Sequence, residues 1–313
     1  MSAGLTRREL LRLACIGSAA AAVAPVETAT AAVHSEKPQA APGAVGMLYD
    51  ATVCTGCKAC MAACNQVNEL PADSAGSGGL YHAPLDLNSK TKNIIKLYQA
   101  PNAGKWSFVK RQCMHCLDPA CVSGCPFEAL SKDPEKGVVR WDGSRCIGCR
   151  YCEIACPFQI PKFEWDKWNP RIVKCEFCIT QRLEKGEQPG CTGACPTGAV
   201  IFGKRDALLA EAKRRIAASP GKYFENRVYG EKDAGGTQVF YLAAVPFKDL
   251  GLPELGTDSI PYYATKVNAK LYKWLSGPLV LYGILALAVN RNWKHHRHEQ
   301  EQHEAKGGLP EQL

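Results

Sequence analysis

The chain has 313 residues, 17 cysteines and a formal net charge of +8. So many cysteines exclude an ordinary soluble enzyme, and the length excludes a small disulfide-stapled scaffold. The charge is too weak to indicate nucleic-acid binding, and no DNA- or RNA-recognition motif accompanies it, so we expect no nucleic-acid partner. The length allows one large domain or two ordinary ones.

Residues 1–32 have the pattern of an export signal. Arg7 and Arg8 form an arginine pair that precedes an alanine-rich stretch with an A-x-A cleavage site. This pattern predicts a twin-arginine signal peptide, and an ordinary secretory signal or a disordered tail is the alternative. Cys15 lies in this segment. It is interpreted as incidental, because Arg12 stands where a lipoprotein attachment site would need an apolar residue.

The other sixteen cysteines form four groups of four. The groups are Cys54, Cys57, Cys60 and Cys64; Cys113, Cys116, Cys121 and Cys125; Cys146, Cys149, Cys152 and Cys156; and Cys175, Cys178, Cys191 and Cys195. Groups one and three are spaced C-x2-C-x2-C-x3-C, and in groups two to four a proline follows the fourth cysteine. In two-cluster ferredoxins, three closely spaced cysteines bind one [4Fe–4S] cluster and the fourth binds the other cluster. The spacing therefore predicts four [4Fe–4S] clusters.

Other uses of the cysteines fit the spacing less well. Four-cysteine zinc sites need only two C-x2-C pairs and leave the third cysteine and the x3-C-P without a role. Adjacent C-x2-C triplets are also poor partners for unique disulfide pairing. Covalent haem attachment needs C-x-x-C-H, which none of the four groups has.

The segment between groups two and three predicts a ferredoxin module. It reads CPFEALSKDPEKGVVRWDGSRCIGC, which indicates a short helix, a strand, a turn at 133–137, a second strand and then the next cysteine group. This is the layout of a two-cluster bacterial ferredoxin. We therefore expect groups two and three to share two clusters.

The outer groups contain the same pieces in swapped order. GMLYDATVCTGC before group one matches VVRWDGSRCIGC before group three, and CPTGAVIFGK after group four matches CPFEALSKD after group two. This internal repeat predicts that the strand near Val200–Phe202 pairs with the strand near Met47–Tyr49. The fold class is therefore expected to be α+β, with two interlaced two-cluster ferredoxin modules in a domain over residues 43–205.

The repeat also predicts which cysteines bind each cluster. The four sets are Cys54, Cys57, Cys60 and Cys195; Cys175, Cys178, Cys191 and Cys64; Cys113, Cys116, Cys121 and Cys156; and Cys146, Cys149, Cys152 and Cys125.

Several residues near the cysteines are candidates for a minor role. His115 could donate a hydrogen bond to a cluster sulfur or could simply be solvated. Positive side chains beside cysteines would raise cluster potentials, or would only form a solvated basic surface. Trp165 and Trp168 are interpreted as packing or partner contacts. The positive residues are Lys58, Arg111, Arg150, Lys162 and Lys174.

The remaining segments carry no predicted chemistry. Residues 66–105 form a long insertion, interpreted as a surface loop because it contains ADSAGSGG. Residues 206–268 are expected to form an accessory segment with a surface helix, RDALLAEAKRRIAAS, and a buried strand, GGTQVFYLAAV. A membrane-spanning helix is predicted over residues 269–293, although its uncharged run is short for a bilayer. The positive residues of the 294–313 tail would place that tail in the cytoplasm.

Four segments resemble a known family over nearly the whole chain. They are GMLYDATVCTGCKAC, KRQCMHCLDPACVSGCP, YCEIACPFQIPKFEW and YGEKDAGGTQVFYLAAVPFKDLGLPEL. They resemble the four-cluster iron–sulfur subunits of the dimethyl sulfoxide reductase, formate dehydrogenase and nitrite reductase type, and among these the hydrogenase-2 type. The resemblance implies the same pairing of cysteine groups.

The resemblance also implies a function and partners. We expect a non-catalytic electron-transfer subunit of a membrane-bound [NiFe] uptake hydrogenase. It would link the small and large catalytic subunits to an integral, quinone-reducing membrane subunit. The cluster domain would face the periplasm at the inner membrane. Formate dehydrogenase is the alternative, which the separate signal peptide disfavours, and a zinc-stabilised structural or sensing module is an alternative of another class.

Overall fold

A computed structural model describes residues 38–72, 84–99, 106–168 and 170–305. All of them belong to one compact unit, Glu36–Leu313. The signal-peptide prediction for residues 1–32 lies outside the described residues. So does the end of the tail, residues 306–313.

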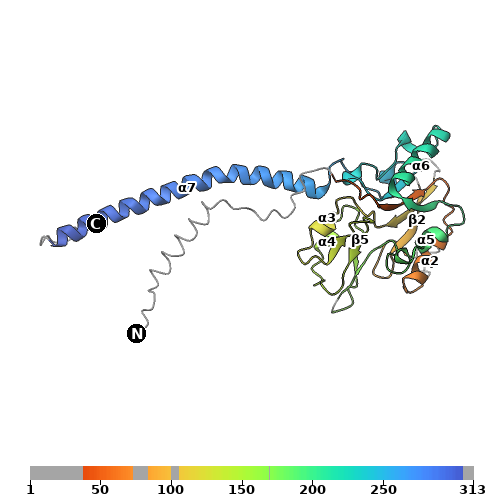
Figure 1. The fold of residues 1–313 in the computed structure, drawn as a ribbon, viewed down its shortest axis with the longest axis horizontal. Coiled ribbons are helices and arrows are strands. Elements are labelled where there is room, and N and C mark those ends of the chain that lie inside the picture. Colours follow the sequence, from red (N-terminus) through yellow and green to blue (C-terminus); the bar gives the residue numbers. More distant parts are fainter. Residues whose placement is uncertain (1–37, 73–83, 100–105, 169, 306–313) are drawn as a thin grey trace. The chain divides into compact units, whose positions relative to one another are not determined.

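The described chain combines short strands with helices that are mostly short, apart from α6 and the long α7 (Figure 1). The α-helices are α2 Ala59–Val67, α3 Ala120–Ser123, α4 Tyr151–Ala155, α5 Gly190–Gly193, α6 Arg205–Ala218 and α7 Ile260–Ala305. The strands are β1 Val45–Asp50, β2 Asn93–Gln99, β3 Trp106–Gln112, β4 Leu130–Lys132, β5 Val139–Trp141, β6 Lys162–Phe163, β7 Ile172–Val173, β8 Val200–Lys204 and β9 Val239–Leu242. Short 3₁₀ turns are η2 Leu183–Lys185, η3 Phe224–Asn226, η4 Asp233–Gly235 and η5 Phe247–Leu250.

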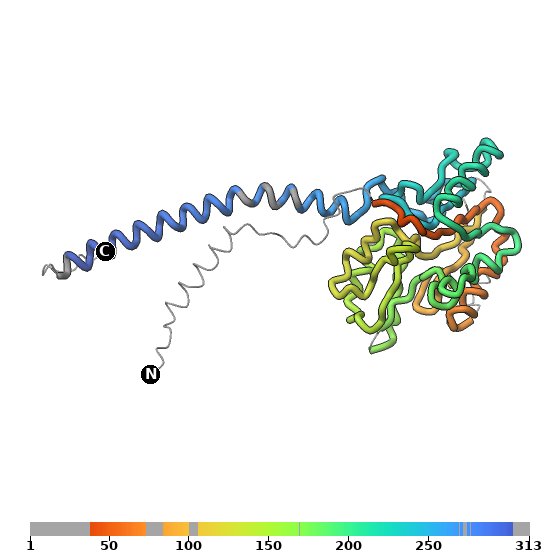
Figure 2. The backbone as a smooth tube through the Cα atoms, viewed as in Figure 1, coloured from red at the N-terminus to blue at the C-terminus, as the bar shows by residue number. Residues whose placement is uncertain are grey.

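The central sheet has the strand order β8-β1-β9. Strand β1 is antiparallel to β8, with Met47 opposite Phe202 and Tyr49 opposite Val200. This register confirms the strand pairing predicted from the repeat. On its other edge β1 is parallel to β9, so segments about 190 residues apart lie side by side (Figure 2). The buried strand predicted in the accessory segment is β9, and it belongs to this sheet.

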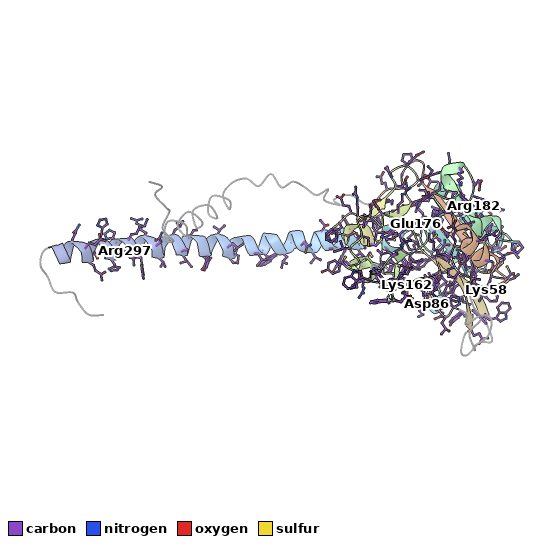
Figure 3. All side chains as sticks on the ribbon, turned by 90° about the horizontal axis from the view of Figure 1, so that it is seen from below. Lys58, Asp86, Lys162, Glu176, Arg182 and Arg297 are labelled. Atoms are coloured by element: carbon purple, nitrogen blue, oxygen red, sulfur yellow. The ribbon has the colours of Figure 1, made fainter. Side chains whose placement is uncertain are left out.

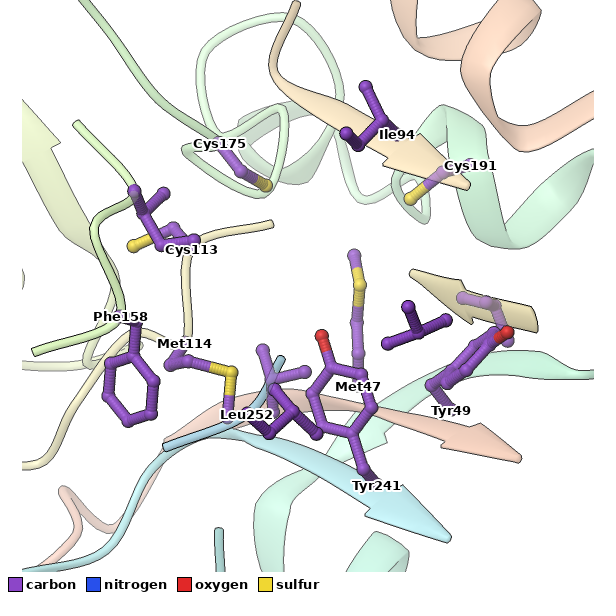
Figure 4. Packing of buried hydrophobic residues seen from close by; sticks show 14 of the residues in the cluster. Met47, Tyr49, Ile94, Cys113, Met114, Phe158, Cys175, Cys191, Tyr241 and Leu252 are labelled. Carbon is purple, nitrogen blue, oxygen red and sulfur yellow. The ribbon is translucent and has the colours of Figure 1, made fainter. Parts of the chain in front are cut away.

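The two faces of the central sheet bury different cores. Alternate residues of a strand point to opposite faces, so Met47 and Tyr49 lie in the main core while Leu48 lies in a smaller one. Helix α6 contributes Leu208 and Ala212 to the smaller core. The predicted surface helix is thus confirmed, and it covers one face of the sheet. Figure 4 shows the main core, in which cysteine side chains pack among Met47, Tyr49 and Tyr241.

The predicted hairpin between groups two and three is confirmed. Strands β4 and β5 pair antiparallel, with Leu130 opposite Trp141. The turn forms because Asp133 Oδ1 accepts the backbone N–H groups of Glu135 and Lys136. Gly137 completes the turn with a φ of +70°, a conformation that favours glycine.

The insertion over residues 66–105 is only partly the loop that was predicted. Strand β2 pairs along its whole length with β3, and its Ile94 and Ile95 are buried in the main core. The apolar residues of NIIKLYQ explain this correction, because they supply a face that a strand can bury. Part of the predicted loop, residues 73–83 and 100–105, lies outside the described residues.

The segment predicted to span a membrane forms part of the 46-residue helix α7. Within the described residues, no helix combines the length and the hydrophobicity that crossing a bilayer requires. The membrane-spanning helix predicted over residues 269–293 is therefore not found there. The uncharged run from Trp274 to Val289 is shorter than the ~20 residues that a spanning helix needs, and charged residues continue the helix beyond it.

Candidate metal centres

The same backbone arrangement recurs before group one and before group three. Asp50 Oδ1 accepts hydrogen bonds from the backbone N–H and hydroxyl of Thr52, at 3.0 and 2.6 Å. Asp142 Oδ1 accepts the same pair from Ser144, at 2.8 and 2.6 Å. The N–H groups of the two aspartates donate to the carbonyls of Ala199 and Ala129, each at 2.8 Å. The sequence repeat is therefore also a structural repeat.

Helix pairs bring the cysteine groups together. Helix α2 of group one packs on α5 of group four, and α3 of group two packs on α4 of group three. Each helix begins in its cysteine loop, so the packing places the sulfurs of paired groups near one another. The pairs are those predicted from the repeat.

The structure gathers the cysteines into four sites, which we call A to D. Site A consists of Cys54, Cys57, Cys60 and Cys195, and site B of Cys64, Cys175, Cys178 and Cys191. Site C consists of Cys113, Cys116, Cys121 and Cys156, and site D of Cys125, Cys146, Cys149 and Cys152. Sites A and D each line a small cavity.

A left-handed residue shapes the first loop of every group. It is the second residue between the first two cysteines: Gly56, His115, Gly148 and Phe177, with φ values of +70°, +48°, +72° and +54°. A side chain at Gly56 would collide with the Phe108 ring, 2.3 Å from the added Cβ. The loops of groups two and four carry rings at this position, and those rings lie against each other with centroids 3.9 Å apart.

The four sites form a series. Charge on Cys191 of site B contributes to the raised pKa of Cys60 in site A, and charge on Cys152 of site D contributes to that of Cys121 in site C. The ring contact between the site C and site B loops joins the two halves. The order is therefore A, B, C, D. Site B is wholly buried, whereas Cys57 of site A and Cys149 of site D are exposed.

Because the cysteine thiols of the four sites are largely buried, they ionise poorly unless a cation stabilises the thiolates. Burial, with the charges of neighbouring cysteines, raises the pKa of Cys60, Cys121 and Cys152 to about 12. Metal ligation needs thiolates, so a bound cation must stabilise them. The described cysteines are all free thiols, in sets of four, and this donor set fits iron–sulfur clusters.

Cys195 is half-buried and differs from the fully buried cysteines. Burial raises its pKa, but hydrogen bonds from the backbone N–H groups of Val200, Thr197 and Ala199 and from the Thr197 hydroxyl outweigh burial and lower it. Cys156 is also followed by proline and receives backbone hydrogen bonds, although burial still raises its pKa. The turns after these two cysteine–proline pairs therefore supply donors to the sulfur.

Lys110 lies buried between sites A and B and was not predicted. Burial alone would lower the pKa of Lys110, but the charges of Cys191, Cys60 and Cys175 outweigh burial and raise it well above its ordinary value. Its ammonium donates to Gln112 Oε1. Figure 4 shows Cys175 and Cys191 facing the same region as the Tyr241 hydroxyl, which donates to the Lys110 carbonyl at 2.6 Å.

Asn68 was also missed by the sequence analysis. Its Nδ2 donates to Cys64 Sγ at 3.6 Å and to Cys178 Sγ at 3.7 Å, both in site B. Lys92 Nζ donates to Asn68 Oδ1 at 2.9 Å and holds the amide in this orientation. Neither residue stands beside a C-x2-C pair, so no spacing signal marks them.

The positive residues that were predicted beside cysteines have different environments. Lys174 is buried, and its ammonium donates to backbone carbonyls of Val139 and Cys175. Arg150 stacks 3.8 Å from the centroid of Trp165. Lys162 pairs with Glu153 at 3.6 Å, and Figure 3 shows it on the compact part of the chain.

The remaining candidates range from half-buried to fully exposed. Arg111 Nη2 donates to the Phe158 carbonyl at 3.1 Å. Lys58 has a left-handed backbone directly before α2, which matches Arg150 before α4. Trp168 is fully exposed, and Trp165 is largely exposed.

The accessory segment holds the loop of group two. Leu117 N–H donates to the Gly236 carbonyl at 2.9 Å, and Gln238 N–H donates to the His115 carbonyl at 3.2 Å. Cys116 forms an isolated antiparallel bridge with Thr237. Site C therefore depends on residues about 120 positions later in the chain.

Across the described residues, no three histidine, cysteine or acidic side chains converge closely enough to hold a single metal ion. A cubane cluster does not require such convergence, because each of its thiolates binds a different iron.

Comparison with known proteins agrees with this geometry. Residues 104–205 match the 4Fe-4S dicluster domain family. The hydrogenase-2 operon protein HybA of Escherichia coli O157:H7 is 37% identical, over 94% of this chain and 98% of that protein. The chain belongs to the HybA family of iron–sulfur proteins.

This HybA-family chain also resembles iron–sulfur subunits of formate dehydrogenases. The nitrate-inducible enzyme's subunit of Escherichia coli K12 is 34% identical, over 77% of this chain and 81% of that subunit. The formate dehydrogenase iron–sulfur subunit of Haemophilus influenzae is 33% identical, over 63% of this chain and 64% of that subunit.

Proposed function

We propose that this HybA-family chain is the electron-transfer subunit of a periplasmic [NiFe] uptake hydrogenase. It holds four [4Fe–4S] clusters, one at each of sites A to D. It accepts electrons from the small and large catalytic subunits and passes them to a quinone-reducing membrane subunit. The chain itself performs no bond chemistry.

The serial arrangement of the four sites carries this proposal. Sites B and C lie between sites A and D, and each end of the series has an exposed cysteine, Cys57 or Cys149. A structural metal centre has no need of a connected series with two accessible ends. A relay between two partners needs both.

The protein's own residues bind and insulate the clusters. Each cluster accepts and releases one electron at a time, and the cysteines fix its place in the series. Backbone N–H groups donate to Cys195 and Cys156, and Lys110 places a positive charge between sites A and B. Such contacts favour the more negative, reduced state and so set the potential of each site.

The arginine pair Arg7–Arg8 supports export by the twin-arginine route, which carries folded proteins. In this proposal the cluster domain acts at the periplasmic face of the inner membrane. The quinone-reducing partner supplies its association with that membrane.

The second candidate is the same relay in a formate dehydrogenase. The identity to formate dehydrogenase subunits favours it, whereas the near-complete coverage of HybA favours hydrogenase. Purification from native membranes in mild detergent, with partners attached, separates the two. We expect the visible absorption of the clusters to bleach under hydrogen but not under formate. Bleaching under formate alone would replace the donor and leave the relay intact.

A zinc-stabilised structural module is the remaining alternative. The purified protein would then be colourless, and metal analysis would find zinc in place of iron. Broad visible absorption that disappears on reduction excludes this alternative.

A further inference from the structure

His115 occupies a demanding position in the loop of site C. It lies between Cys113 and Cys116, is completely buried and has a φ of +48°. Groups one and three have glycine at the matching position, where this conformation has no steric cost. A buried histidine in the left-handed region costs on the order of 1 kcal/mol, so the surrounding structure must hold it there.

The hydrogen bonds of the ring determine its proton. Nδ1 accepts the backbone N–H of Val139 at 3.0 Å, so the neutral ring carries its proton on Nε2. Among the residues that the structure describes, nothing accepts a hydrogen bond from this buried Nε2. Leaving such a donor unsatisfied costs about 1–3 kcal/mol.

A residue of the site B loop also holds the His115 ring in place. Phe177, which holds the matching position in the site B loop, lies 3.9 Å away between centroids at an interplanar angle of 39°. Val139 and Phe177 together fix the ring, so the Nε2 donor has a fixed direction.

We propose that His115 Nε2 donates a hydrogen bond to a sulfur of the cluster at site C and raises the reduction potential of that cluster alone. This inference rests on the proposed function, because it requires a [4Fe–4S] cluster at Cys113, Cys116, Cys121 and Cys156. A sulfur acceptor satisfies the donor. It also explains why a histidine stands where groups one and three have glycine.

The expected effect follows from the charge of the cluster. A hydrogen bond to sulfur stabilises the reduced state more than the oxidised one. A bond of ordinary strength changes the reduction equilibrium about tenfold, which is ~59 mV for a one-electron couple.

The test uses two variants of the full-length protein, His115→Asn and His115→Gln. Asparagine tolerates the left-handed backbone and keeps an acceptor for Val139, but it has no donor at the Nε2 position. Glutamine keeps a donor that reaches about as far as Nε2. Redox titration followed by electron paramagnetic resonance gives the potential of each cluster, and Cys121→Ser identifies the site C signal by removing or altering it.

We expect His115→Asn to lower the reduction potential of site C by ~59 mV, which is a tenfold change in the reduction equilibrium. The iron content and the other three potentials should stay unchanged. The site C potential of His115→Gln should stay close to the wild-type value, because glutamine keeps the donor. An unchanged site C potential would overturn the inference and would mean that a buried water satisfies Nε2. Equal shifts at all sites would also overturn it, as a general disturbance of packing. A wild-type protein without any clusters would instead refute the proposed function.

Discussion

Lys110 is a buried cation that two neighbouring cysteine sites share. Its side chain is fully buried close to Cys60, Cys175 and Cys191, and negative charge on these cysteines raises its pKa. A buried ammonium is costly unless it is compensated. The compensation acts in both directions, so the ammonium also stabilises negative charge on sites A and B.

Replacing Lys110 by methionine should lower the reduction potentials of sites A and B and leave site D unchanged. Methionine keeps the volume and removes the charge. We expect the reduction equilibrium of each affected site to change about tenfold, as measured by redox titration. Lys96→Met is the matched control, because Lys96 lies on the adjacent strand with a third of its side chain exposed and pairs with Asp86. Equal effects of the two variants would contradict the prediction.

Cysteine spacing makes the metal-site residues predictable, but it does not reveal the residues that tune them. The C-x2-C and C-x3-C spacings together mark all sixteen cysteines because the loop geometry depends on local sequence. Lys110 and Asn68 reach the sites from β3 and from the end of α2, through tertiary packing. His115 could be singled out because it stands inside a C-x2-C pair.

At the level of elements, β9 approaches β1 more closely than a side chain would allow. Gly46 of β1 faces the backbone carbonyl of Gln238, which would lie 2.4 Å from an added Cβ. That carbonyl also accepts the Met47 N–H at 2.9 Å. Glycine is therefore required where the two strands begin to pair.

Gly46→Ala should destabilise the fold by about 1–3 kcal/mol, because overpacking forces β9 away from β1. Thermal denaturation followed by circular dichroism should show a transition several degrees lower. Gly203→Ala is the control: Gly203 lies opposite Gly46 on β8, and its added Cβ would meet only Leu208, at 3.7 Å. A transition unchanged in Gly46→Ala, or lowered equally in Gly203→Ala, would rule out this role for the β1–β9 contact.

The internal repeat allowed some strand pairings to be predicted from the sequence, but it gave no information about others. The β4–β5 hairpin and the β1–β8 pair follow from two copies of one pattern in the sequence. The β2–β3 hairpin has no second copy, and β2 lies inside the insertion that was predicted to be a loop. The parallel pairing of β9 with β1 depends on contacts 190 residues apart, which a local pattern does not encode.

At the scale of the whole molecule, the proposed relay passes electrons through the four sites in series, so it makes an internal site indispensable. Cys178 belongs to site B, which is buried between sites A and C. Cys178→Ser should damage the site B cluster and leave site D intact. Under hydrogen, only the clusters on the donor's side of site B should then bleach rapidly in the intact complex. Bleaching of all remaining clusters at the wild-type rate would mean that electrons bypass site B.

The interlaced arrangement has a consequence for synthesis. A ribosome makes the amino-terminal end first, at roughly 5–20 residues per second. The cysteines of group one therefore emerge on the order of ten seconds before group four, since more than a hundred residues separate Cys64 from Cys175. Groups two and three, made in between, provide all the cysteines of sites C and D before group four is made. Sites A and B receive their last ligands, Cys191 and Cys195, only after group four has been translated, so their assembly requires both ends of the four-group segment.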